Sequence, residues 1–374
     1  MALRALARVN LAAIERNCAH LRRAAGDAAL GAVVKADGYG HGAAPCARAA
    51  LAGGASWLAV AAAGEAAALR DAGVEAPILV MGALSPPELD VALAARAEVV
   101  AWRESFVAAA TRRARPGEPA RVHVKLDTGM GRLGTRDPEE ATRVVAAVEA
   151  AAGLELAGAM THFATADEED DDFFAVQLER FRAWAVPLRA QRPGLVLHAA
   201  NSAATLRDRG AAFDAVRCGV AVYGLDPFQR DAAERGLEPA LELCSYVGEL
   251  KPCATGESAG YGRRFVAACE TTLAVLPIGY GDGVRRGLGG NAEVLIGGRR
   301  RPLVGTVSMD NVTVDLGPEP DAATGTPATL IGRQDAEQVT AEEWARRLGT
   351  INYEVTCALS ARVPRAYHRD GTPA

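Results

Sequence analysis

Eight short apolar runs alternate with alanine-rich helical patterns along the first part of the chain, and this alternation limits the possible folds most strongly. Alternating strands and helices predict parallel strands joined by crossover helices. Eight such units in roughly 235 residues fit a closed (β/α)8 TIM barrel better than an open sheet. The predicted strands are 30–34, 57–60, 78–81, 98–102, 122–126, 156–160, 196–198 and 215–217, and the clearest helical patterns are 139–151 and 172–191.

The pattern changes after about residue 237. Four short runs, separated by glycine and proline turns, have the composition of strands. Only 340–348 has a clear helical pattern, and Thr340 stands where its cap would be. We therefore predict a mainly antiparallel β domain after the barrel. The four runs are 273–276, 292–296, 312–314 and 328–330.

Composition excludes several classes of protein. The net charge of −5 gives no reason to expect a nucleic acid or an anionic membrane as partner. No run reaches the ~18 apolar residues of a membrane span, and the first ten residues lack the apolar core of a secretion signal. The seven cysteines are scattered, without a C-x-x-C pair, which favours reduced thiols in the cytoplasm.

The first segment with chemical potential is VVKADGYGHG, residues 33–42. Lys35 follows an apolar strand directly and precedes a glycine-rich loop, so in a barrel it points into the mouth. A lysine that is partly desolvated there has a lowered pKa and could form a Schiff base with an aldehyde. A solvated loop lysine is the alternative.

A second segment, KLDTGMGRLG at 125–134, satisfies the G-x-G-x-x-G pattern of dinucleotide-binding turns. We reject that interpretation because the pattern follows the fifth strand and Asp127 and Thr128 separate it from the strand end. Arg132 is better suited to bind a carboxylate or a phenolate oxygen. Lys125 could be an ordinary barrel lysine.

Three further strand ends carry polar groups. His162 could stack on a flat cofactor or bind a metal, or it could be an ordinary core residue. Because the six histidines show no H-x-x-x-H or H-E-x-x-H spacing, we expect no metal. Asn201 and Ser202 stand at a predicted helix start, where a phosphate could bind or an ordinary N-cap could lie. Phosphate sites of barrels commonly follow strands seven and eight, so the segment from Arg217 supports the first possibility.

Taken in order, these segments resemble alanine racemase, a family of fold type III pyridoxal-phosphate enzymes. The resemblance covers nearly the whole chain and rests on VVKADGYGHG, KLDTGMGRLG, THFATADE, NSAA, VRCGVAVYG, GYG, LPIGYGDG, VGTVSMD and TINYEV. It implies the barrel and β domain predicted above, and also that the N-terminal stretch joins the β domain. The predicted domains are 1–9 (N-terminal strand of the β domain), 10–236 (barrel binding pyridoxal phosphate) and 237–374 (β domain).

The resemblance also implies a role for each matching residue. Lys35 would carry pyridoxal 5'-phosphate and act as one catalytic base, and Tyr261, from the partner subunit of a homodimer, would be the opposite base. Arg217 would contact the pyridine nitrogen, and His162 would pack against the ring. Arg132 would lie near the phenolic oxygen and the substrate carboxylate, beside a Lys125 that can be carbamylated. The phosphate-binding positions are Tyr39, Ser202, Gly219, Val220 and Tyr353, with Asn201 beside them, and those at the substrate pocket and its mouth are Met309 and Tyr280.

The implied activity is the interconversion of L-alanine and D-alanine, supplying D-alanine for peptidoglycan. Three alternatives remain. A serine or broad-specificity racemase would share the mechanism. A pyridoxal-phosphate-binding homeostasis protein resembles the barrel alone, and a β domain bearing Tyr261 speaks against it. A fold type III decarboxylase would be expected to place an acidic residue where Arg217 stands.

Overall fold

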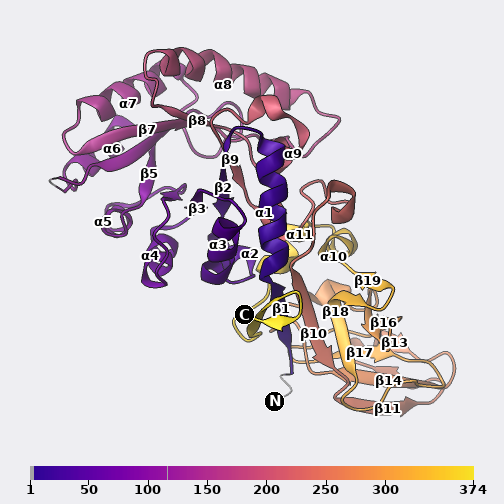
Figure 1. The fold of residues 1–374 in the computed structure, drawn as a ribbon. Coiled ribbons are helices and arrows are strands. Elements are labelled where there is room, and N and C mark those ends of the chain that lie inside the picture. The colour runs from indigo at the N-terminus through magenta and orange to yellow at the C-terminus, as the bar shows by residue number, and fades with distance from the viewer. Residues whose placement is uncertain (1–3, 116) are drawn as a thin grey trace. The chain divides into compact units, whose positions relative to one another are not determined.

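The computed structural model describes residues 4–115 and 117–374, so part of the predicted 1–9 segment lies outside the described residues. The chain forms two compact units (Figure 1). The barrel unit comprises Ile14–Phe228 and Ala233–Glu238. The β unit comprises Met1–Ala13, described from Arg4, together with Gln229–Ala232 and Pro239–Ala374. The domain boundaries expected from the sequence stay a prediction.

The barrel unit is a closed ring of eight parallel strands, which confirms the predicted (β/α)8 fold. Each strand pairs in parallel with the next, and β2 also pairs with β9 to close the ring. The strands are almost wholly buried apolar runs because helices cover their outer face. They are β2 (Ala29–Val33), β3 (Trp57–Val60), β4 (Ile78–Val80), β5 (Glu98–Ala101), β6 (Ala120–Lys125), β7 (Leu154–Met160), β8 (Val196–His198) and β9 (Ala215–Cys218).

Local chemistry fixes where the helices begin. Asp137 caps one helix by accepting the N–H of Glu139 at 2.9 Å, and a proline occupies the first helical position. Another helix begins after Ser85, where Glu88 accepts the Ser85 backbone N–H at 2.8 Å. The helices are α1 (Leu11–Ala25), α2 (Lys35–Tyr39), α3 (Ala43–Ala52), α4 (Ala63–Asp71), α5 (Pro86–Ala94), α6 (Glu104–Thr111), α7 (Pro138–Ala150), α8 (Phe173–Ala190) and α9 (Ser202–Arg207).

The β unit is built on an eleven-stranded, mostly antiparallel sheet. Strand β1 (Leu6–Asn10) pairs antiparallel with β10 and parallel with β20, so the N-terminal strand joins this sheet. The strands on the main path are, in order, β11 (Glu249–Cys253), β14 (Thr271–Leu276), β17 (Val312–Asp315), β16 (Arg299–Val304), β15 (Ala292–Ile296), β18 (Pro327–Gln334), β10 (Leu241–Tyr246), β1, β20 (Arg365–Arg369) and β21 (Thr372–Pro373); β19 (Glu337–Val339) pairs with β18.

After strand β19, the described part of the β unit contains the helices α10 (Ala341–Leu348) and α11 (Asn352–Cys357), of which the sequence predicted only the first. Thr340 caps α10 by accepting the N–H of Glu343 at 3.1 Å, as expected. The expectation that 340–348 is the only clear helix of this region was wrong, because Asn352–Cys357 also forms a helix, α11. The left-handed Gly349 ends α10, and the buried Asn352 donates to Glu342 at 2.9 Å and starts the chain on a new helix.

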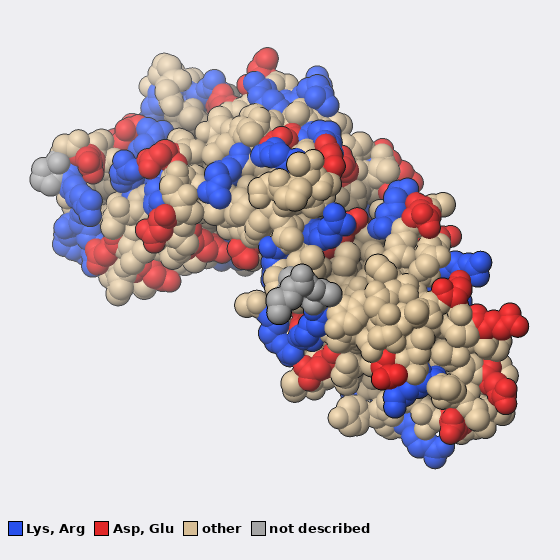
Figure 2. All heavy atoms as spheres, turned by 60° about the horizontal axis from the view of Figure 1, so that its bottom comes forward, with Lys and Arg blue, Asp and Glu red and all other residues tan. Residues whose placement is uncertain are grey.

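The surface carries both signs of charge. On the face seen in Figure 2, acidic and basic side chains are interspersed over the molecule. Among the described residues, none of the helices has the length and apolar character needed to cross a membrane.

Candidate active site

Lys35 follows strand β2 and begins a strained turn, α2. Ala36, Asp37 and Tyr39 all have φ of 52°, in the left-handed region, and Gly38 has 62°. Each non-glycine residue in this region costs about 1–2 kcal/mol, so the surrounding structure must impose it. Side chains supply part of the restraint: Glu65 accepts the N–H of Ala36 at 2.6 Å, and Asp37 accepts the N–H of Ala43 at 2.8 Å.

The turn brings Tyr39 against the segment after β9. The Tyr39 ring lies 5.2 Å from the Tyr223 ring, whose hydroxyl donates to the Val33 carbonyl at 3.1 Å. A side chain at Gly219 would occupy the place of the Tyr39 hydroxyl, so a larger residue there would displace Tyr39. The Lys35 ammonium lies 5.9 Å from the centre of the Tyr39 ring. The strained turn therefore sets Lys35, Tyr39 and Gly219 close together.

The ends of β8 and β9 are joined through Ser202. Its hydroxyl oxygen accepts the N–H of Gly219 at 2.9 Å and that of Ala221 at 3.4 Å. The helix cap is Asn201, whose side chain accepts the N–H of Ala204 at 2.9 Å, so the Ser202 hydroxyl does not serve as the cap. The buried Val220 follows Gly219 in the same segment. Four of the predicted cofactor-binding residues of the barrel unit, Asn201, Ser202, Gly219 and Val220, thus lie in two adjoining segments.

Arg217 in β9 is 2% exposed and is held by main-chain oxygens. It donates to the carbonyls of Thr161, His198 and Ala199 at 2.6, 2.9 and 2.9 Å. Among the described residues, its buried Nε has no hydrogen-bond partner. Burial lowers the pKa of Arg217 to about 10, which leaves the guanidinium charged near neutrality. The side chain is thus fixed and carries one unsatisfied donor.

Lys125 and His162 share this buried cationic environment. Burial, with the nearby charges of Arg217 and Arg132, lowers the pKa of Lys125 to about 8. Burial, followed by Arg217, Lys125 and Arg132, holds the pKa of His162 well below its usual range. His162 Nδ1 lies 3.3 Å from the Arg217 guanidinium. Arg132 is exposed on the loop after β6, which Asp127 shapes by accepting the N–H groups of Gly129 and Gly131.

The remaining predicted residues belong to the β unit. Tyr261, Tyr280 and Met309 are 73%, 44% and 52% exposed, which is unusual for large hydrophobic side chains. Hydrogen bonds tie their three loops together: Thr306 donates to the Tyr261 carbonyl at 2.8 Å, and Tyr280 donates its N–H to Ser308 at 2.9 Å. Tyr261 begins a short 3-10 turn (Tyr261–Arg263), whereas Tyr353 lies in helix α11.

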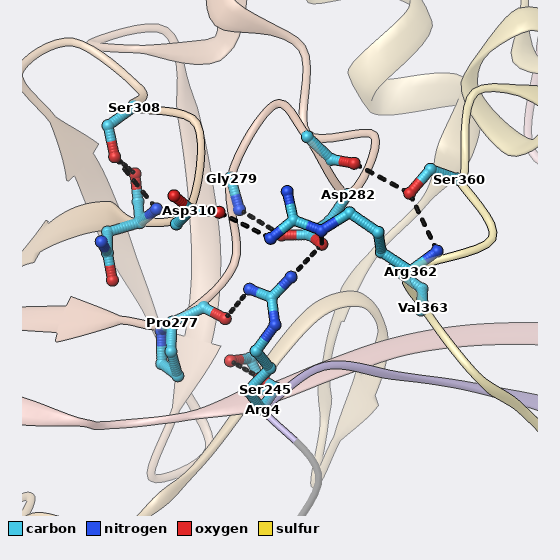
Figure 3. A network of polar contacts seen from close by, with 12 residues as sticks. Arg4, Ser245, Pro277, Gly279, Asp282, Ser308, Asp310, Ser360, Arg362 and Val363 are labelled. Carbon is cyan, nitrogen blue, oxygen red and sulfur yellow. Dashed lines mark hydrogen bonds and ion pairs between the residues drawn. The ribbon is translucent and has the colours of Figure 1, made fainter.

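A buried carboxylate fixes the loop of Tyr280 (Figure 3). Asp282 is fully buried and accepts the N–H of Gly279 at 2.9 Å. It pairs with Arg4 and with Arg362, and Arg362 also donates to Asp310 at 2.6 Å. These contacts connect the N-terminal strand, the Tyr280 loop and the Met309 loop (Figure 3). Rigid loops thus carry the exposed side chains of the β unit.

Comparison with known proteins identifies the family. Residues 9–227 match the N-terminal domain and residues 240–367 the C-terminal domain of alanine racemase. The chain is 44% identical to an alanine racemase of Frankia casuarinae over 98% of this chain and 96% of that protein. It is 42% identical to alanine racemase 1 of Bacillus subtilis over 98% and 93%. The structure of an alanine racemase from Streptomyces coelicolor superposes with a TM-score of 0.91 at 40% identity, covering 97% of each chain.

The chain belongs to the alanine racemase family. The predicted family and enzyme class, an isomerase, are thereby confirmed. The alternatives of a homeostasis protein that resembles the barrel alone and of a decarboxylase lose their basis, because the family match extends through the β unit.

The residues of the barrel unit fit the pyridoxal phosphate of an alanine racemase. The unsatisfied Nε of Arg217 is a donor suited to an unprotonated pyridine nitrogen. Ser202 and the N-terminus of the segment 220–223 offer hydroxyl and N–H groups, which suit a phosphate. Lys35, the only one of the chain's three lysines that follows a strand directly into the strained turn, suits the aldehyde.

The structure adds residues that the sequence did not single out for a role. His198 accepts from Arg217 at 2.9 Å, and His123 and Glu98 continue from it. The sequence held one indication of a role for His123. His123 and Lys125 are two residues apart in a strand, so both must face the same side of the barrel wall. The contacts of His123 with β5 and β8 are long-range, and no local pattern contains them.

Proposed function

We propose that this enzyme interconverts L-alanine and D-alanine with pyridoxal 5'-phosphate bound in the barrel unit. The observation that carries the proposal is the donor of Arg217: a fixed, charged guanidinium with one unsatisfied N–H beside His162 and Lys125. The family relatives named alanine racemase support the substrate.

Bound pyridoxal phosphate would supply the delocalisation that makes the α-proton of alanine acidic enough to remove. The chain's own task is to hold two bases on opposite faces of that carbon. Lys35 Nζ would take or return the proton on one face, and the Tyr261 hydroxyl would do so on the other. Because either base can start the cycle, one pair of residues serves both directions.

Arg217 would orient the ring through its Nε. A guanidinium can only donate a hydrogen bond, so it leaves the pyridine nitrogen unprotonated. His162 would pack against the ring, and the low pKa that its buried cationic surroundings impose keeps it uncharged there. Neutral packing on one side and a cationic donor at the nitrogen limit how the ring can lie.

The opposite end of the cofactor would be anchored by its phosphate. The donors proposed for it are the hydroxyls of Tyr39 and Ser202 and the main chain at Gly219 and Val220, with Asn201 fixing α9 beside them. Tyr353, from the β unit, completes the proposed set.

Arg132 would bind the substrate carboxylate and the cofactor's phenolic oxygen. Lys125, with a pKa of about 8, is partly uncharged near neutrality, and an uncharged amine can add carbon dioxide. The resulting carbamate is an anion and would orient Arg132. Met309 and Tyr280 would border the substrate pocket and its mouth, and a small pocket there would favour alanine.

We also propose a homodimer in which Tyr261, Tyr280 and Met309 serve the partner's site. Three large hydrophobic side chains exposed on mutually hydrogen-bonded loops are typical of a surface that a partner covers. We further propose a cytoplasmic location and a role in supplying D-alanine for peptidoglycan, both as expected for the family.

Proton NMR in D2O tests the activity. The enzyme with added pyridoxal phosphate is given L-alanine and, separately, D-alanine, and the product is analysed on a chiral column. Loss of the α-proton signal with appearance of the other enantiomer from either side is expected. Exchange with serine but not alanine would change the substrate, and a bound cofactor without exchange for any amino acid would overturn the proposal.

A further inference from the structure

A row of hydrogen-bonded side chains, here called the hydrogen-bond chain, starts at Arg217 and crosses the interior of the barrel. The Arg217 guanidinium lies 2.9 Å from His198 Nδ1, and His198 Nε2 lies 2.8 Å from His123 Nδ1. His123 Nε2 lies 2.5 Å from a carboxylate oxygen of Glu98. These residues come from β9, β8, β6 and β5 of the barrel unit. The hydrogen-bond chain runs from the carboxyl ends of the strands, where the site lies, to their amino ends.

Arg217 fixes the direction of every hydrogen bond in the chain. A guanidinium can only donate, so His198 Nδ1 must accept and the ring proton must be on Nε2. His123 Nδ1 then accepts from His198, and its own proton must be on Nε2, which donates to Glu98. If either imidazole were protonated on both nitrogens, two N–H donors would face each other in one of its contacts. Both rings are therefore neutral in this arrangement.

The barrel wall makes room for the two rings. A side chain at Gly158 in β7 would collide with the His123 ring at Nδ1, the atom that contacts His198. On the other side, the Trp57 ring packs edge-on against His198 with centroids 5.7 Å apart, in space that a side chain at Gly31 would fill. His198 is fully buried and His123 is 5% exposed. The surroundings therefore hold both rings in one orientation.

The end of the hydrogen-bond chain farthest from Arg217 is the Glu98 carboxylate, whose negative charge is stabilised by its neighbours. Arg121 donates to the other oxygen of Glu98 at 2.8 Å and also pairs with Glu155. Burial raises the pKa of Glu98, but the hydrogen bonds from His123 and Arg121 and the charge of Arg121 lower it further, so the net shift is downward. Glu98 and Arg121 line a cavity of about 410 Å³ at the amino ends of the strands. The carboxylate thus lies apart from every residue proposed to touch the cofactor.

We propose that Glu98, His123 and His198 are positioning residues that hold Arg217 as a one-way hydrogen-bond donor. The Glu98 carboxylate polarises the two imidazoles, which strengthens His198 Nδ1 as an acceptor and offsets the buried charge of Arg217. The chain cannot pass a proton toward the atom that Arg217 faces, because its direction reverses only if Arg217 loses its own proton. This rests on the proposed function in one respect, the pyridine nitrogen as that atom.

The first test needs no cofactor. Two-bond ¹H–¹⁵N NMR of the ¹⁵N-histidine-labelled protein distinguishes the two neutral tautomers from the cation, and His123→Gln and His198→Gln assign the signals. We expect both histidines to be neutral at pH 7 with the proton on Nε2. A cationic ring, or a proton on Nδ1 of either residue, would overturn the proposal whether or not the protein racemises alanine.

The second test uses the holoenzyme and two matched glutamates. Glu98 and Glu155 both pair with Arg121, but of the two only Glu98 accepts from His123. Glu98→Gln should shift the ¹⁵N resonance of ring-labelled pyridoxal phosphate and lower kcat about tenfold with little change in KM, as loss of one charged hydrogen bond does. Glu155→Gln should do neither. Equal effects of the two variants would reduce the role of Glu98 to its ion pair and overturn the proposal.

A substitution at His198 separates positioning from proton transfer if Glu98→Gln does not fold. Glutamine can accept from Arg217 and donate to His123 but cannot carry a proton between them, whereas leucine does neither. We expect His198→Gln to keep the ring-nitrogen resonance and most of kcat, and His198→Leu to change both. Equal loss in the two variants would contradict a positioning role.

Discussion

The side chains with a proposed function are carried in opposite ways by the two units. In the barrel unit Lys125 and Arg217 are 4% and 2% exposed, and burial shifts their pKa values. In the β unit Tyr261 and Met309 are more than half exposed, on loops that hydrogen bonds make rigid. The barrel unit thus tunes groups by removing them from water, and the β unit presents groups on a surface.

This difference fits the division of roles proposed for the two units. A cofactor must be held in one orientation with its charges balanced, which a buried cationic cluster achieves. A second base must reach the opposite face of the substrate, which an exposed side chain on a rigid loop can do once a partner covers it. The comparison predicts that substitutions in the barrel unit alter cofactor binding and charge, whereas those in the β unit alter turnover with the cofactor still bound.

Replacing Lys35 should have the largest effect, because this residue is proposed both to bind the cofactor covalently and to act as a catalytic base. We expect Lys35→Ala to lower racemisation by about four orders of magnitude, since it removes a general base and the covalent attachment together. Borohydride reduction, which fixes a lysine-bound aldehyde, should label the wild type and not the variant. Lys251→Ala is the matched control, because Lys251 is exposed in β11. Labelling that survives in Lys35→Ala would assign the cofactor to another lysine.

Tyr261→Phe should come next and remove proton transfer on only one face of the α-carbon. We expect kcat to fall about a thousandfold, within the usual contribution of one acid–base group, while the cofactor spectrum stays unchanged. In D2O, the enantiomer whose α-proton faces Lys35 should still exchange without inversion. Tyr246→Phe, in strand β10 of the same unit, serves as the control. If both enantiomers stop exchanging, or the cofactor is lost, the proposed division between the units fails.

The sequence predicted the barrel unit better than the β unit for a physical reason. Parallel strands buried on both faces are continuous apolar runs, so all eight predicted strands overlap observed ones and β3 and β8 coincide with their predictions. In the β unit, strand β16 begins with three arginines that pair with acidic neighbours, as Arg300 does with Glu293, and its run is not apolar. Those pairings are set by the sheet, and the local sequence does not contain them.

The candidate site shows the same limit. The motifs that lie on single loops, such as those of Lys35 and Ser202, could be selected from the sequence. The chain from Arg217 through His198 to His123 depends on the order in which strands close the barrel. Likewise, Arg4 and Asp282 meet only because the N-terminal strand joins the β sheet. Residues that act through distant neighbours require the fold.

The buried Lys125 of the barrel unit should make the stability of the protein depend on pH, whereas an exposed lysine of the β unit should not. The pKa of Lys125 in the folded protein is about 8, below the ordinary 10.5, so the folded state binds fewer protons than the unfolded state between these values. Stability should therefore rise with pH across this window, by about 3 kcal/mol in total. Urea denaturation from pH 7 to 10 in bicarbonate-free buffer measures the slope. Lys125→Met should flatten it and Lys251→Met should not; an unchanged slope in Lys125→Met would place the effect elsewhere.

Ser202→Ala should have the smallest effect and locates the phosphate end. The hydroxyl accepts the N–H groups of Gly219 and Ala221, and it would donate one hydrogen bond to the phosphate. We expect the Kd for pyridoxal phosphate to rise about tenfold, as the loss of one charged hydrogen bond predicts, with kcat retained at saturating cofactor. Ser56→Ala, at an exposed position before β3, is the control. If Tyr353→Phe weakens binding while Ser202→Ala does not, the phosphate is held mainly by the β unit. The barrel unit would then only orient the ring, and cofactor binding would belong to both units.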